Sequence, residues 1–90
     1  MRVQKFQMVS RQLASAMKNY RSEHNMTVST FARIASIYGK SYDVHLTPTE
    51  IHNYENCIHV PRALKLQTLM NAMQMDFEDL TIMKENNDDL

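Results

Sequence analysis

The sequence predicts a small all-α domain, and three observations support this fold class. Near its C-terminal end, apolar residues recur at helical spacing: Leu66, Leu69, Met70 and Met73. Two segments have the signature of a capped helix start, because Thr47 is followed three residues later by Glu50, and Asp76 by Asp79. Ninety residues with 43% hydrophobic content suit one soluble domain with a modest core.

The first half of the chain predicts two helices. The apolar stripe of the first helix consists of Leu13, Met17 and Tyr20. Asn25 occupies the position where a left-handed residue ends such a helix, and Thr27 can cap the next one. We expect the second helix to reach Tyr38 before Gly39, the only glycine of the chain, ends it and a loop leads to Leu46.

The second half predicts a short third helix whose entry is strongly defined. Thr47 and Glu50 form a capping box, and Pro48 suits the first helical position. Leu46 and Ile51 can pack together as a hydrophobic staple. After a loop at residues 56–60, we expect a longer amphipathic helix and a final short helix.

Residues 46–80 resemble the second half of the Cro/CI-type (XRE-like) helix-turn-helix family. Tyr54-Glu55 matches the aromatic residue or Leu and the Glu of the family's recognition helix. The later L-x-x-L-x-x-A-L and V-S-x-x-x-L patterns are matched by Leu66, Leu69, Ala72 and Met73, and by Met75, Asp76 and Leu80. Upstream, Met26-Thr27 followed by Phe31-Ala32 resembles the family's L-S-x-x-x-L-A.

The resemblance implies a five-helix lambda-repressor-like DNA-binding domain over residues 1–84, with a recognition helix at about 47–56. It also implies an ion pair between Arg21 and Glu55. One departure is large, because the segment between Ala32 and Thr47 is longer than the family pattern. The tight turn that sets the angle between helices two and three is therefore not predicted by the resemblance.

If the family's docking applies, the recognition helix enters the major groove of double-stranded operator DNA. The expected base contacts are Thr47, Thr49, Glu50, His52 and Asn53. The expected backbone contacts are Thr27, Val28, Ser29, Arg33, Lys40, Asn56, His59 and Arg62. Glu50 can accept a hydrogen bond from cytosine but repels phosphate, and its capping bond competes for the carboxylate.

Other classes of function find little support. Cys57 is the only cysteine, no Cys or His pair has zinc-ligand spacing, and one glycine provides no phosphate-cradling loop. We expect no enzyme, no metal or other cofactor and no small-molecule ligand. No apolar run approaches a membrane span, so we expect a cytoplasmic protein. The resemblance implies in addition that it is bacterial or phage-encoded and associated with the nucleoid.

The charge distribution is polarised although the formal net charge is zero. Up to Tyr42 there are seven basic residues and one acid; from Asp43 onward three basic residues face nine acids. A basic first half can meet DNA, whereas the acidic residues 85–90 are expected to be a disordered tail.

Two functions remain open. A small phage-type or plasmid-type Cro-like repressor, paired as a homodimer or higher homo-oligomer, is the first. Its dimer surface is expected at residues 77–83 or at an N-terminal segment, with these apolar candidates: Ile82 and Met83, or Val3, Phe6 and Met8. The alternative is a protein-interaction module of the same fold, such as an antitoxin or adaptor, which the zero net charge, Glu50 and the long insertion favour.

Overall fold

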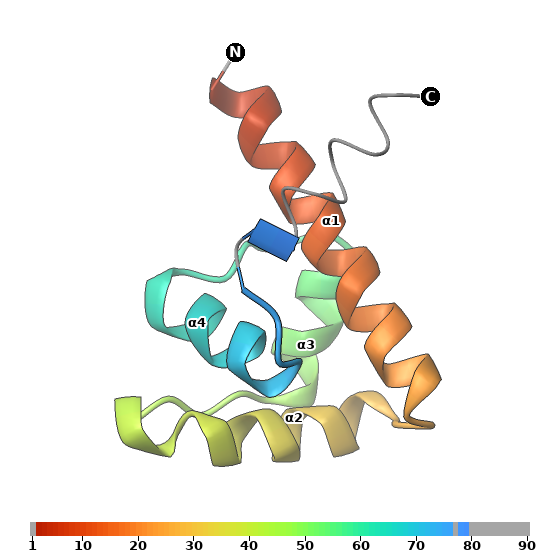
Figure 1. Ribbon diagram of the computed structural model, residues 1–90, viewed down its shortest axis with the longest axis vertical. Helices are drawn as coiled ribbons and strands as arrows, with labels where there is room; N and C mark the ends of the chain where they lie inside the picture. Colours follow the sequence, from red (N-terminus) through yellow and green to blue (C-terminus); the bar gives the residue numbers. More distant parts are fainter. Residues whose placement is uncertain (1, 77, 80–90) are drawn as a thin grey trace.

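The described part of the chain forms four α-helices and one short 3-10 helix (Figure 1). The computed structural model describes residues 2–76, 78 and 79, and the side chains from Ser10 onward. The elements are α1 (Arg2–Glu23), α2 (Val28–Tyr38), η1 (Lys40–Tyr42), α3 (Pro48–Glu55) and α4 (Ala63–Ala72). Within these residues there is no strand, so the all-α class is confirmed.

The expected fifth helix and the two expected dimer surfaces are not tested by the described residues. Most of the fifth helix and all of the acidic tail lie outside the described residues, as do the side chains of the N-terminal candidates. None of the helices in the described part of the chain is long and apolar enough to cross a membrane.

The core forms where the four helices meet. α1 packs on α3, and α2 packs on both α3 and α4. The largest fully buried side chains are Met17, Phe31, Leu46, Ile51, Thr68, Leu69 and Met70. Full burial of each large apolar side chain contributes about 1.5–3 kcal/mol, so Ile51 and the preceding Leu46 help to hold α3 in place.

The predicted helix starts are confirmed. Thr47 and Glu50 form a complete capping box, in which Thr47 Oγ1 accepts from the Glu50 amide and Glu50 Oε1 accepts from the Thr47 amide at 3.1 Å. Thr27 caps α2 by accepting from the Thr30 amide. Asp76 and Asp79 exchange the same pair of bonds, at 2.9 and 3.2 Å.

Three helices end at a left-handed residue, and none of the three is glycine. Asn25, Cys57 and Gln74 have φ angles of 53°, 58° and 56° after α1, α3 and α4. After α3, the Ile58 amide donates to the Asn53 carbonyl at 2.8 Å, which completes a Schellman motif. The predicted left-handed role of Asn25 is confirmed, and Cys57 has a backbone role in a turn.

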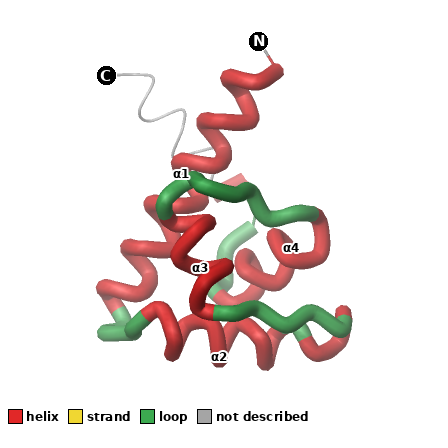
Figure 2. Tube along the Cα trace, turned by 180° about the vertical axis from the view of Figure 1, so that it is seen from behind, coloured by secondary structure: helices red, strands yellow, loops and turns green. Residues whose placement is uncertain are grey.

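The insertion between α2 and α3 forms a closed loop that returns to α2. Beyond Tyr38 the chain makes η1, reverses at Asp43 and runs back along α2 toward α3 (Figure 2). The Ser36 hydroxyl joins the two arms, because it accepts from the Leu46 amide at 2.9 Å and lies 3.1 Å from the Leu46 carbonyl. We call residues 37–45 the excursion. Because its ends meet at Ser36 and Leu46, α3 still starts beside α2 despite the extra residues.

Gly39 ends α2 as expected, but for an unexpected reason. Its φ angle is −83°, so it does not use the left-handed freedom of glycine. A Cβ atom at this position would lie 2.5 Å from the Val44 carbonyl oxygen and 3.0 Å from the Val44 Cβ. Glycine is required because the returning backbone passes this close to α2.

Gly39→Ala should therefore destabilise the domain by about 1–3 kcal/mol, because the new methyl group overlaps backbone that is fixed at both ends. Urea unfolding followed by circular dichroism measures this loss. Ser41→Ala, at an exposed position of η1, is the control and should change stability by less than about 0.5 kcal/mol. Equal stability of Gly39→Ala and the unmodified protein would show that the excursion does not pack as described.

Candidate nucleic-acid interface

α3 presents a short polar surface between two loops. Thr49 and His52 are exposed and Asn53 is half-buried, whereas Ile51 and Tyr54 point into the core. The excursion precedes α3 and is joined to it by Leu46 and Thr47. The loop of residues 56–62 follows α3 (Figure 2). Hydroxyl, imidazole and amide groups can each donate or accept hydrogen bonds at base edges.

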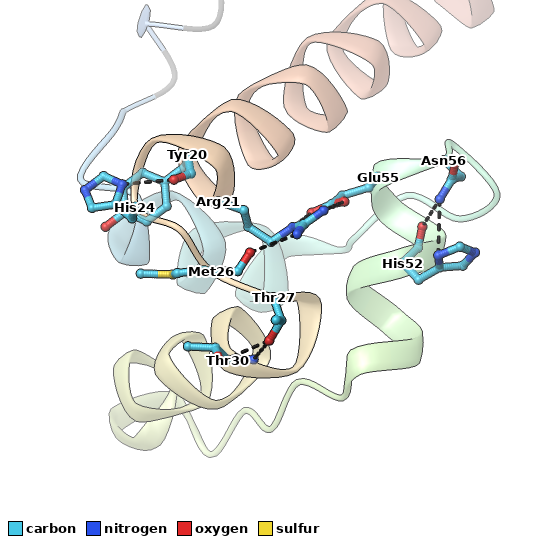
Figure 3. Close-up of polar contacts among 9 residues, drawn as sticks. All are labelled: Tyr20, Arg21, His24, Met26, Thr27, Thr30, His52, Glu55 and Asn56. Carbon is cyan, nitrogen blue, oxygen red and sulfur yellow. Dashed lines mark hydrogen bonds and ion pairs between the residues drawn. The ribbon is translucent and has the colours of Figure 1, made fainter.

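The C-terminal end of α3 is tied to α1 by the expected ion pair (Figure 3). Arg21 donates from Nε and Nη2 to the two carboxylate oxygens of Glu55, at 2.7 and 2.8 Å. The Glu55 side chain is only 3% exposed and that of Arg21 is 21% exposed. The hydrogen bond with Glu55 raises the pKa of Arg21 above its ordinary value. Arg21 also donates to the Met26 carbonyl at 3.0 Å, so one guanidinium joins α1, the turn before α2 and α3.

The N-terminal end of α3 has a second ion pair, which connects it to α4. Glu50 Oε1 accepts from Thr47, and Glu50 Oε2 accepts from Lys65 Nζ. Burial raises the pKa of Glu50, but the bonds from Lys65 and Thr47 outweigh it and hold the pKa below its ordinary value. The bond with Glu50 raises the pKa of Lys65. Both carboxylates of α3 are thus neutralised within the domain.

The expected backbone contacts lie in two groups, one before and one after α3 along the chain. Before α3 are Thr27, Val28, Ser29, Arg33 and Lys40; after it are Asn56, His59 and Arg62. Val28 is half-buried against the core, so only its amide is suited to a phosphate. Asn56 Nδ2 donates to the His52 carbonyl at 2.8 Å, and the Thr27 hydroxyl is used in its cap (Figure 3).

Sequence reasoning missed Lys65 and a groove beside it. The groove has a volume of about 720 Å³ and runs between α3, the following loop and the start of α4. Its lining residues are Val44, Glu50, Tyr54, His59, Val60, Arg62, Ala63, Leu64 and Lys65. No local signal in the sequence pairs Lys65 with Glu50, because the two residues lie on different helices fifteen positions apart.

The described residues contain no cluster of three His, Cys, Asp or Glu side chains that could hold a metal ion. Comparisons with protein-family models, with curated proteins and with solved structures found no match to this chain.

Arg21→Met should destabilise the domain by about 3 kcal/mol, because it leaves the buried Glu55 carboxylate without its partner. The double variant Arg21→Met/Glu55→Met should be more stable than Arg21→Met alone, since it removes the unpaired charge as well. Urea unfolding measures both. Arg11→Met, at an exposed position of α1, is the control and should change stability by less than about 0.5 kcal/mol. Additive losses in the double variant would contradict the coupling.

The lowered pKa of Glu50 predicts a contribution to acid sensitivity. A carboxylate with a lowered pKa in the folded state contributes stability above its unfolded pKa of about 4.3. That contribution is lost as the pH falls through the folded pKa. Glu50→Gln should therefore lose less thermal stability than the unmodified protein when the pH is lowered from neutral to below about 4. Glu23→Gln, at an exposed position of α1, should keep the acid sensitivity of the unmodified protein. Identical profiles for all three proteins would contradict this role of Glu50.

Proposed function

We propose that this chain is a sequence-specific DNA-binding protein of the Cro/CI type, in which α2 and α3 form the helix-turn-helix. It acts as a small phage-type or plasmid-type transcriptional regulator. The observation that carries the proposal is that α3 combines an exposed polar face with complete internal pairing of its two acids. The remaining polar groups of this face, on the exposed Thr49 and His52 and the half-buried Asn53, are of the kinds that read base edges.

The charge pairing removes the main physical objection to DNA binding. An unpaired carboxylate on a reading helix would repel phosphates at the contact distance. Here Arg21 neutralises Glu55, and Lys65 neutralises Glu50. The exposed cations Arg33, Lys40 and Arg62, before and after α3 along the chain, are left for the DNA backbone.

The anchoring of α3 also supports the proposal. The capping box fixes its first turn, Ile51 fixes its buried face, and Glu55 fixes its last turn. A helix held at both ends loses little further freedom on binding, which favours precise reading of a groove. In this docking Thr49 and Asn53 lie one turn apart on one face and contact neighbouring bases, and Asn53 pairs with adenine. A domain of this size reads few base pairs, so we propose that it binds a two-fold operator as a homodimer.

The second candidate is a protein-interaction module, and the groove beside α3 favours it. Leu64 in its wall is 52% exposed and Val60 is 40% exposed, which is typical of a surface that docks an apolar partner. The two candidates differ in one measurable property, which is the affinity for DNA at low salt.

Asn53→Ala and Thr49→Ala should each weaken binding to the DNA upstream of this gene by roughly 10- to 100-fold, because each loses contacts to a base edge. Fluorescence anisotropy with that duplex and with a scrambled duplex measures both affinity and preference. The preference should disappear in the variants while weak, salt-sensitive binding to both duplexes remains.

Gln67→Ala is the matched control, because Gln67 is an exposed amide on α4 that bonds only to Asn71. It should bind both duplexes as the unmodified protein does. If the folded, unmodified protein binds neither duplex at low salt, the DNA-binding proposal fails and the protein-interaction candidate replaces it.

A further inference from the structure

The excursion encloses a hollow on the side of α2 that leads to the start of α3. The hollow has a volume of about 300 Å³. Its lining residues are Arg33, Ser36, Ile37, Lys40, Asp43, Val44 and His45. Arg33 and Lys40 are cationic, His45 carries an imidazole and Asp43 is acidic. They come from three separate segments, namely α2, η1 and the returning chain.

The cations of the hollow are available to a ligand. Within the described residues the ion pairs use Arg21 and Lys65, and neither Arg33 nor Lys40 has an acidic partner. Both side chains are exposed, as is that of His45. Two full positive charges against the single carboxylate of Asp43 favour an anion, and the imidazole of His45 adds a hydrogen-bond donor.

The hollow also has apolar lining residues, which distinguishes it from a site for a small free anion. Ile37 is 56% exposed and lines the hollow together with Arg33 and Lys40, and Val44 of the returning chain lines it as well. A phosphodiester backbone alternates anionic phosphates with apolar sugar faces, so it matches cations next to an aliphatic side chain. A free phosphate has no part that would contact Ile37.

The position of the hollow relative to α3 fits the same ligand. Ser29 and Arg33 lie one helical turn apart on α2, and Lys40 lies in η1 just beyond its end, where it lines the same hollow as Arg33. The returning chain passes through Leu46 directly into Thr47, the cap of α3. The Ser36 bridge and the close approach at Gly39 hold both arms in place without a ligand.

We propose that the excursion and α2 together form a backbone clamp, in which Arg33 of α2 and Lys40 and His45 of the excursion bind DNA phosphates flanking the groove read by α3. This inference rests on the proposed DNA-binding function and deepens it, because it joins the Arg33 and Lys40 backbone contacts with His45 in a single phosphate site. It predicts that the protein needs duplex beyond its base-specific site, on the flank next to the start of α3. The loop of residues 56–62 would hold the opposite flank.

The test is the double variant Arg33→Gln/Lys40→Gln, with Arg11→Gln/Lys18→Gln as control. The control removes the same charge from exposed positions of α1. Fluorescence anisotropy across a salt series is measured on operator and scrambled duplexes, each in a short form and a form extended at both flanks. The Arg33/Lys40 variant should weaken binding to both extended duplexes by a similar factor of about 10, keep the operator preference, and lower the salt slope by roughly 1–2. On the short duplexes it should differ little from the unmodified protein.

Two outcomes would overturn the inference, and they are distinguishable from each other. If the unmodified protein prefers its operator but both double variants weaken binding equally, the excursion holds no phosphate site and the DNA-binding function stands. If the unmodified protein binds no duplex, the function and the clamp fail together. Circular dichroism of each variant shows whether its fold is intact.

Discussion

The buried pair of Arg21 and Glu55 is the interaction on which the arrangement of the helices depends. A single guanidinium bonds both oxygens of Glu55 and the carbonyl of Met26, so it reaches α1, the turn before α2 and the last turn of α3. Few side chains other than Arg present a planar set of donors that can do this. Because Glu55 is almost fully buried, a displacement of α3 that separated it from Arg21 would leave a buried carboxylate without a partner, which is strongly destabilising. Apolar packing holds the helices together, and this pair joins α1, the turn before α2 and α3 at one point.

The second ion pair has a different effect, which concerns the surface more than the packing. Lys65 reaches from α4 to Glu50 and lies at the edge of the exposed face of α3. The pair is partly exposed, so its contribution to stability is modest. Its effect on the charge of that face is larger, because it converts an acidic helix start into a neutral one. A chain of zero net charge can in this way present a face that does not repel a polyanion.

The parts of this architecture that depend on nearby residues could be predicted from the sequence. Helix caps and helix ends involve residues only a few positions apart, so the residue types alone are sufficient to predict them. This applies to the caps at Thr27 and at Thr47 with Glu50, to Asn25, and to the end of α2 at Gly39. The Arg21–Glu55 pair was accessible only through the resemblance to a family. Contacts between residues that only tertiary packing brings together could not be predicted. These are the Lys65–Glu50 pair, the Ser36–Leu46 hydrogen bonds, the groove beside α3 and the hollow beside the excursion. The reason for Gly39 was also inaccessible, since steric approach by a distant backbone leaves no local pattern.

The closed form of the excursion has a consequence for how chains of this architecture can diverge. The Ser36 hydroxyl and the Leu46 backbone are hydrogen-bonded to each other, so the start of α3 is fixed beside α2 at the base of the excursion. The close approach of Gly39 and Val44 constrains the same base, whereas residues 40–43 at the tip are exposed. Changes of length at that tip should therefore disturb the angle between the two helices less than changes in a tight turn that sets the angle directly. Natural variation or design can alter the tip while α3 keeps its place.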